Sequence, residues 1–195
     1  GFYIAETGRP GPVLIDVPKD VPQNGSPMDF PEEFKIQGYH PWYDHAMVAC
    51  EKAIEMLLNS EKPIILAGGG TIISSAFAEL QSIAETLMIP VVTTFKGKGA
   101  FPENHPLSLG PIGMHGHAEA NKMMAEADCV LAIGTRFSDR SVGTFEAFEK
   151  RLKIIHMDVD PAEIGKNQTT SLAVVGDVRT SLRVMVKLLL QKAIR

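Results

Sequence analysis

Short apolar runs alternate with segments of helical periodicity from residue 63 to the end of the chain. The runs are Pro63–Ala67, Pro90–Thr94, Cys129–Ile133, Ile154–Asp158 and Leu172–Val175. Runs that are apolar throughout are typical of strands buried on both faces. Strands alternating with helices predict an α/β fold, in which a parallel sheet is flanked by helices on both faces. Right-handed crossovers then place the carboxyl ends of all the strands at one edge of the sheet, called here the carboxyl edge.

Helices are expected between these strands. Asp44 is predicted to cap a first helix. Its apolar residues are expected to cluster on one side, at Met47, Val48, Ala53, Ile54, Met56 and Leu57. Further helices are predicted over residues 74–87 and 118–127, and a closing helix is expected to contain Leu182 and Leu189.

The first 42 residues follow a different pattern. Gly1–Glu6 resembles the end of a helix, and because it begins without Met we expect the chain to be a piece of a longer protein. Val13–Val17, closed by Pro18, is predicted to be a strand. Residues 21–42 are rich in Pro, Gly and polar side chains, which is typical of a linker. We therefore expect residues 1–20 to be the tail of a preceding domain and residues 43–195 to form the next domain.

Composition restricts the partners. The net charge of −4 over 195 residues gives no general attraction to nucleic acid or to an anionic membrane. Cys50 and Cys129 have no metal-ligand spacing around them, so both are predicted to be buried free thiols, as suits a reducing cytoplasm. Apolar runs long enough to span a membrane are absent from the sequence.

The loops that follow the strands share a chemistry. Gly68-Gly69-Gly70 lets the backbone approach a ligand, and Gly134 to Arg140 supplies two guanidinium groups for an anion. Asp158 offers a carboxylate for ribose hydroxyls, and Gly176-Asp177 repeats the glycine-acid pattern one strand later, whereas Asp160 is expected to start a short helix. Each loop alone is also compatible with an ordinary turn or a solvated surface. Because several of them meet at the carboxyl edge, they predict a long, polyanionic, ribose-containing ligand.

A nicotinamide cofactor fits this pattern poorly. The third glycine of the dinucleotide fingerprint would fall at Ile73, and no acidic ribose ligand follows Thr93-Thr94. His115 and His117 lack a matching set of carboxylates, so we expect no metal site.

Several stretches together resemble the large catalytic subunit of acetolactate synthase (acetohydroxyacid synthase), a thiamine-diphosphate enzyme. Gly8 to Asp20 resembles the end of that family's pyrimidine-binding domain. Gly68-Gly69-Gly70, Gly113-Met114-His115-Gly116, Gly134 to Arg140 and His156 to Asn167 resemble its central domain. The family usually carries Asp where this chain has Ser138, which leaves another flavin-containing carboligase or decarboxylase of the superfamily as an alternative.

The resemblance implies a Rossmann-like central domain that binds FAD as a structural, not redox-active, group. Carried over by position, the residues along the flavin would be Arg9, Gly68, Gly69, Gly70, Thr93, Thr94, Phe95, Ile112, Gly113, Met114, His115, Gly134, Arg136, Asp158, Val159, Glu163, Gly176 and Asp177. Arg140 matches the position that recognises the carboxylate of the acceptor 2-ketoacid, and Lys19 matches a lysine near the substrate channel.

The resemblance also implies the activity of a larger enzyme. That enzyme condenses pyruvate with a second 2-ketoacid, pyruvate or 2-ketobutyrate, in branched-chain amino-acid synthesis. Its main motifs for thiamine diphosphate and Mg²⁺ lie outside this chain, so the chain alone is expected to be inactive. A homodimer or tetramer and a small regulatory subunit are implied as well. A stand-alone NAD-binding module and a scaffold that has lost its ligand remain the rival hypotheses.

Overall fold

The computed structural model describes residues 1–25, 36–39, 46–138 and 152–193, and the chain divides into two units, Gly1–Trp42 and Tyr43–Arg195. The first unit contains helix α1 (Phe2–Glu6), which confirms the helix expected there, and a 3-10 turn η1 (Val21–Gln23). The strand predicted over Val13–Val17 was wrong: these residues are exposed and pair with no strand in the described residues. An apolar run alone is insufficient, because a strand also needs a neighbour for its backbone groups.

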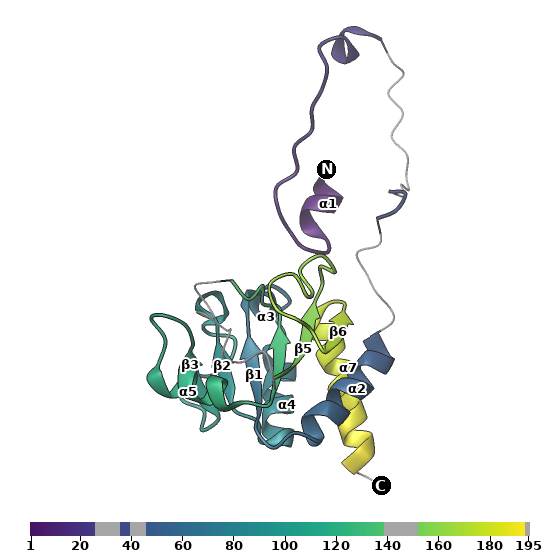
Figure 1. The fold of residues 1–195 in the computed structure, drawn as a ribbon. Coiled ribbons are helices and arrows are strands. Elements are labelled where there is room, and N and C mark those ends of the chain that lie inside the picture. The colour runs from purple at the N-terminus through teal and green to yellow at the C-terminus, as the bar shows by residue number, and fades with distance from the viewer. Residues whose placement is uncertain (26–35, 40–45, 139–151, 194–195) are drawn as a thin grey trace. The chain divides into compact units, whose positions relative to one another are not determined.

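The second unit is built on a parallel sheet (Figure 1). Its strands are β1 (Pro63–Ala67), β2 (Val91–Thr93), β3 (Ser108–Pro111), β4 (Cys129–Ile133), β5 (Lys153–Asp158) and β6 (Leu172–Val175). Among the described residues the order is β3-β2-β1-β4-β5-β6, and every pair is parallel. This order is that of the dinucleotide-binding α/β fold. Strand β3 was not predicted from the sequence, because its Gly and Pro are poor strand formers and it lies half-buried at the sheet edge.

Helices connect the strands. They are α2 (Ala46–Leu58), α3 (Gly69–Ile73), α4 (Phe77–Leu87), α5 (Ala118–Glu126) and α7 (Val178–Ala193), with a 3-10 turn η2 (Phe95–Gly97). The helix predicted over residues 74–87 begins only at Phe77, because Ser75 adopts a left-handed conformation with φ of 52° that ends the preceding α3.

Helix α2, the first of the predicted helices, buries a different side from the one predicted. Its buried residues include Cys50 and Ile54, whereas Met47 and Val48 are exposed, so the predicted apolar side was wrong for these two. The predicted cap, Asp44, lies outside the described residues.

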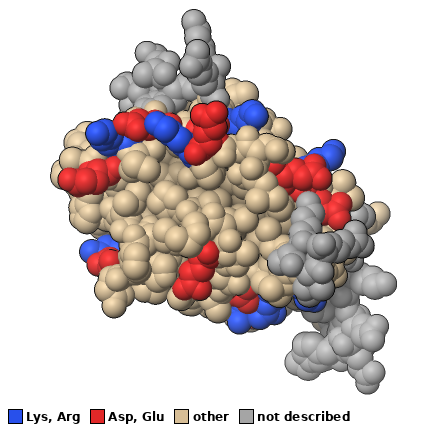
Figure 2. Space-filling model, turned by 90° about the horizontal axis from the view of Figure 1, so that it is seen from below, with Lys and Arg blue, Asp and Glu red and all other residues tan. Residues whose placement is uncertain are grey.

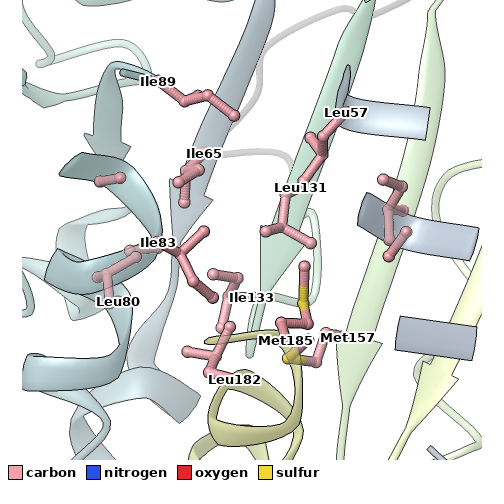
Figure 3. Packing of buried hydrophobic residues seen from close by; sticks show 14 of the residues in the cluster. Leu57, Ile65, Leu80, Ile83, Ile89, Leu131, Ile133, Met157, Leu182 and Met185 are labelled. Atoms are coloured by element: carbon pink, nitrogen blue, oxygen red, sulfur yellow. The ribbon is translucent and has the colours of Figure 1, made fainter. Parts of the chain in front are cut away.

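Two apolar layers cover the two faces of the sheet. On one face, α2, α4 and α7 pack against β1, β4 and β5, and Figure 3 shows the side chains of Ile83, Ile133 and Leu182 close together there. On the other face, Ala120 and Met124 of α5 pack against the alternate residues of the strands. The prediction of helices on both faces is thereby confirmed. Cys50 and Cys129 are buried and free, as predicted, and burial raises the pKa of the Cys50 thiol to about 11.

Asp128, which directly precedes β4, joins the amino ends of β1 and β4. Its carboxylate accepts hydrogen bonds from the backbone N–H groups of Glu61 (2.8 Å) and Lys62 (2.9 Å). Burial would raise the pKa of Asp128, but these hydrogen bonds lower it overall.

Figure 2 looks onto the side of the molecule at which the strands begin, and shows charged side chains around a central uncharged surface. None of the described helices is both long and apolar enough to cross a bilayer.

Candidate ligand site at the carboxyl edge

The centre of the sheet contains the point at which the strand order reverses, between β1 and β4. In open α/β sheets, ligands bind outside the carboxyl ends of the strands at this point. The loop after β1 carries Gly68-Gly69-Gly70, and the loop after β4 begins with Gly134. The structure therefore brings together two of the loops that were predicted to bind a ligand.

These two loops are joined through their backbones. Gly68 N donates to Ile133 O (2.8 Å), and Gly70 N donates to Gly134 O (2.9 Å). A Cβ atom at Gly68 would lie 2.2 Å from the carbonyl oxygen of Gly134, and one at Gly70 would lie 2.6 Å from the Cα of Gly134. Glycine is thus required at both positions by the neighbouring loop. Gly69 is different, since its nearest neighbour would be Lys96 Cβ at 3.3 Å.

The loop after β2 contains Thr93, Thr94 and Phe95. Both threonines are buried, and the Thr94 side chain accepts a hydrogen bond from Gly97 N (3.1 Å), which caps η2. The Phe95 side chain, in contrast, is 86 % exposed. This loop therefore presents one large apolar side chain at the carboxyl edge.

The Gly-Met-His-Gly segment follows β3. Ile112 is buried, and its N–H donates to Thr93 O (2.9 Å). Asn121 of α5 holds the backbone of Gly113, whose N–H donates to Oδ1 (2.9 Å) and whose carbonyl accepts from Nδ2 (3.0 Å). The Met114 side chain is 85 % exposed, and His115 is also exposed. Sequence reasoning missed Asn121, because a single polar residue in a helix forms no pattern.

Residues 134–137, called here the Arg136 loop, are held by two distant residues. His156 Nε2 lies 2.8 Å from Thr135 O, so this nitrogen carries the hydrogen and donates it. Asn167 Nδ2 donates to Arg136 O (2.8 Å). The Arg136 side chain is exposed, and Phe137 is buried against the His156 ring. Arg140 lies outside the described residues, so its predicted role stays a prediction.

The acidic residues at and after the ends of β5 and β6 accept hydrogen bonds from nearby residues. Asp158 is buried, and its carboxylate accepts from Asp160 N (2.9 Å). The helix predicted at Asp160 was wrong: residues 161–166 form turns, and the Asp160 carboxylate accepts from Ala162 N instead. Asp177 caps α7 by accepting from the backbone N–H and the hydroxyl of Thr180, both at 2.8 Å.

The remaining predicted positions on this side of the sheet are also ordered. Glu163 is buried and pairs with Lys166 at 3.5 Å, Val159 is half-buried, and Gly176 N donates to Asp158 O (3.0 Å). Arg9 and Lys19 are exposed residues of the first unit, and the roles assigned to them stay predictions. In the described part of the chain, no group of three or more His, Cys, Asp or Glu residues is arranged to hold a metal ion.

Burial controls the protonation of His156. The pKa of His156 lies below its ordinary value of 6.5 because burial disfavours the charged ring. This effect outweighs the Thr135 carbonyl and the carboxylates of Asp158 and Glu163, all of which favour the charged form. The His156 ring is therefore uncharged in the folded protein at neutral pH.

We expect this histidine to make the protein sensitive to acid. The unfolded chain takes up the proton near pH 6.5, whereas the folded chain does so only at lower pH, so stability falls as the pH drops below about 6.5. The slope from this one residue is at most about 1.4 kcal/mol per pH unit. Urea unfolding of the native protein and of His156→Gln between pH 7.5 and pH 5 measures it. Parallel stability curves for the two proteins would contradict the assignment.

Comparison with known proteins identifies close relatives of the chain. Residues 50–185 match the family described as "Thiamine pyrophosphate enzyme, central domain". The chain is 49 % identical to a probable acetolactate synthase large subunit of Methanocaldococcus jannaschii over 93 % of its length, and 47 % identical to the one of Methanococcus aeolicus over 95 %. It is 45 % identical to an acetolactate synthase of Arthrospira platensis over 93 %. It spans only about a third of these proteins, 31 %, 32 % and 32 % of their respective lengths.

Proposed function

The chain belongs to the thiamine pyrophosphate enzymes as a central domain of that family, and from this premise we propose that it is the FAD-binding central domain of an acetolactate synthase large subunit. The larger protein would condense pyruvate with a second 2-ketoacid, using thiamine diphosphate and Mg²⁺ held by residues outside this chain. We further propose a homodimeric or tetrameric, cytoplasmic enzyme that can take a small regulatory subunit.

The chemistry of the carboxyl edge carries the FAD proposal. The edge combines exposed apolar side chains, Phe95 and Met114, with the exposed guanidinium of Arg136 and the buried carboxylate of Asp158. An isoalloxazine ring is flat and apolar on its faces, a diphosphate is anionic, and a ribose offers hydroxyls. A flavin dinucleotide supplies all three kinds of group in one extended molecule, so the residues present fit it.

The domain would bind and orient rather than catalyse. Arg136 would pair with the diphosphate, Asp158 would accept from ribose, and Phe95 and Met114 would cover the ring. Bound FAD would act as a structural group of this domain, since thiamine diphosphate would supply the carbon–carbon chemistry. Arg140 is proposed to bind the carboxylate of the acceptor ketoacid, and Lys19 to lie near the substrate channel.

The experiment that tests this function is a cofactor titration of the full-length protein. We expect the purified protein to carry a flavin absorption band, and FAD added after its removal to restore the band and acetolactate formation. NAD is the matched control, because the strand order also suits a stand-alone NAD-binding module. Binding of NAD without FAD would favour that module, and binding of neither would favour a scaffold that has lost its ligand.

A further inference from the structure

Two hydrogen bonds fix the peptide groups on both sides of one residue, Arg136. The Thr135 carbonyl, which accepts from His156 Nε2 at 2.8 Å, belongs to the peptide before Arg136. The Arg136 carbonyl, which accepts from Asn167 Nδ2 at 2.8 Å, belongs to the peptide after it. When both flanking peptide planes are fixed, both backbone dihedrals of Arg136 are fixed, and so is the direction in which its side chain leaves the backbone.

The next residue shows that the loop is held in an unfavourable shape. Phe137 has a φ of 49°, in the left-handed region that residues other than glycine rarely adopt. This conformation costs about 1–2 kcal/mol. Phe137 is only 3 % exposed, and its ring meets the His156 ring edge-on, with centroids 5.2 Å apart and planes at 83°. His156 therefore supports the loop by packing as well as by hydrogen bonding.

The second ring nitrogen indicates that His156 is more than core filling. Its Nδ1 is buried and has no hydrogen-bond partner, and a buried polar atom without a partner destabilises the fold. An apolar side chain of similar size would avoid that cost, but it would leave the Thr135 carbonyl without its donor. The destabilisation by the unpaired Nδ1 is understandable if the hydrogen bond from Nε2 keeps the Arg136 loop in the orientation that binding requires.

We infer that His156 and Asn167 are positioning residues, which hold the Arg136 loop so that the guanidinium meets the diphosphate of the ligand. This inference rests on the proposed function. It assigns a positioning role to two residues, one in β5 and one in the segment between β5 and β6, that lie outside the Arg136 loop itself.

A double-mutant cycle in the full-length protein tests the inference. His156→Leu removes the donor, whereas His156→Gln keeps an N–H near the position of Nε2. The loss of one hydrogen bond corresponds to a weakening of FAD affinity by about 3- to 10-fold. We expect this loss for His156→Leu when Arg136 is present, little loss when Arg136 is replaced by Ala, and recovery in His156→Gln. Such non-additivity is the signature of a residue that acts through another one.

Asn167→Asp supplies a second variant, because it keeps the shape of the side chain but removes the donor. It should weaken FAD binding about as much as His156→Leu and show the same dependence on Arg136. Ile83→Val, on the opposite face of the sheet, is the control for general loss of stability and should leave FAD affinity unchanged.

Tryptic cleavage after Arg136 in the absence of ligand tests the positioning role separately from the proposed binding of FAD. We expect cleavage to be faster in His156→Leu and Asn167→Asp than in the native protein or His156→Gln. Unchanged cleavage, or equal losses of FAD affinity with and without Arg136, would overturn the positioning role. Failure of the native protein to bind FAD would instead overturn the proposed function, and the cleavage rates would still decide whether the two residues hold the loop.

Discussion

Replacing Gly68 by Ala is expected to lower the free energy of unfolding by more than about 3 kcal/mol. The added Cβ would lie 2.2 Å from Gly134 O and 2.8 Å from Thr135 Cα, so it meets backbone atoms of the loop after β4 and not the flexible end of a side chain. Backbone atoms of β1 and β4 cannot move apart without breaking the bond from Gly68 N to Ile133 O, which belongs to the centre of the sheet. Urea unfolding followed by circular dichroism measures the change.

Gly69→Ala is the matched control, one residue away in the same run. Its Cβ would first meet the Lys96 Cβ at 3.3 Å, and its φ is not in the left-handed region, so a small shift accommodates it. We expect Gly69→Ala to change stability by less than about 1 kcal/mol, and Gly70→Ala to resemble Gly68→Ala. If all three variants were equally stable, the two loops would not be joined as described.

The core strands could be predicted because their signal is local. Pro63–Ala67, Cys129–Ile133 and Leu172–Val175 are strands with the predicted bounds, since an apolar run between turn residues has few alternatives. Ser108–Pro111 forms a strand because it pairs with the free edge of β2. Its own residues do not indicate this pairing. Val13–Val17 has the better strand sequence but no such neighbour among the described residues.

The candidate site could be located from the sequence but not resolved into roles. The parallel topology places Gly68–Gly70 beside Gly134 whatever their function, and the structure shows that two of the glycines serve contact between loops. His156, Asn167 and Asn121 escaped prediction as loop holders, because each acts on a segment to which only the fold brings it. The local sequence around a residue does not indicate which distant residue it will contact in the folded sheet.

We expect Arg136 and Arg140, which both follow β4 in the sequence, to have different functions. Arg136→Ala is expected to weaken FAD binding by about 10- to 150-fold, which corresponds to the roughly 1.5–3 kcal/mol of a hydrogen bond to a charged group. Arg140→Ala should instead raise the KM for the acceptor 2-ketoacid by a similar factor and leave FAD bound. Equilibrium titration with FAD and acetolactate kinetics at saturating FAD measure the two quantities in the full-length protein.

Conservative variants sharpen the separation. Arg136→Lys keeps the charge but loses the planar fork that matches a diphosphate, so its FAD affinity should lie between those of the native protein and Arg136→Ala. At saturating FAD, Arg136→Ala should recover the native KM, because its guanidinium is assigned to the cofactor and not to the substrate. A raised KM that persists in Arg136→Ala at saturating FAD, together with lost flavin in Arg140→Ala, would reverse the assignment and place Arg140 on the cofactor.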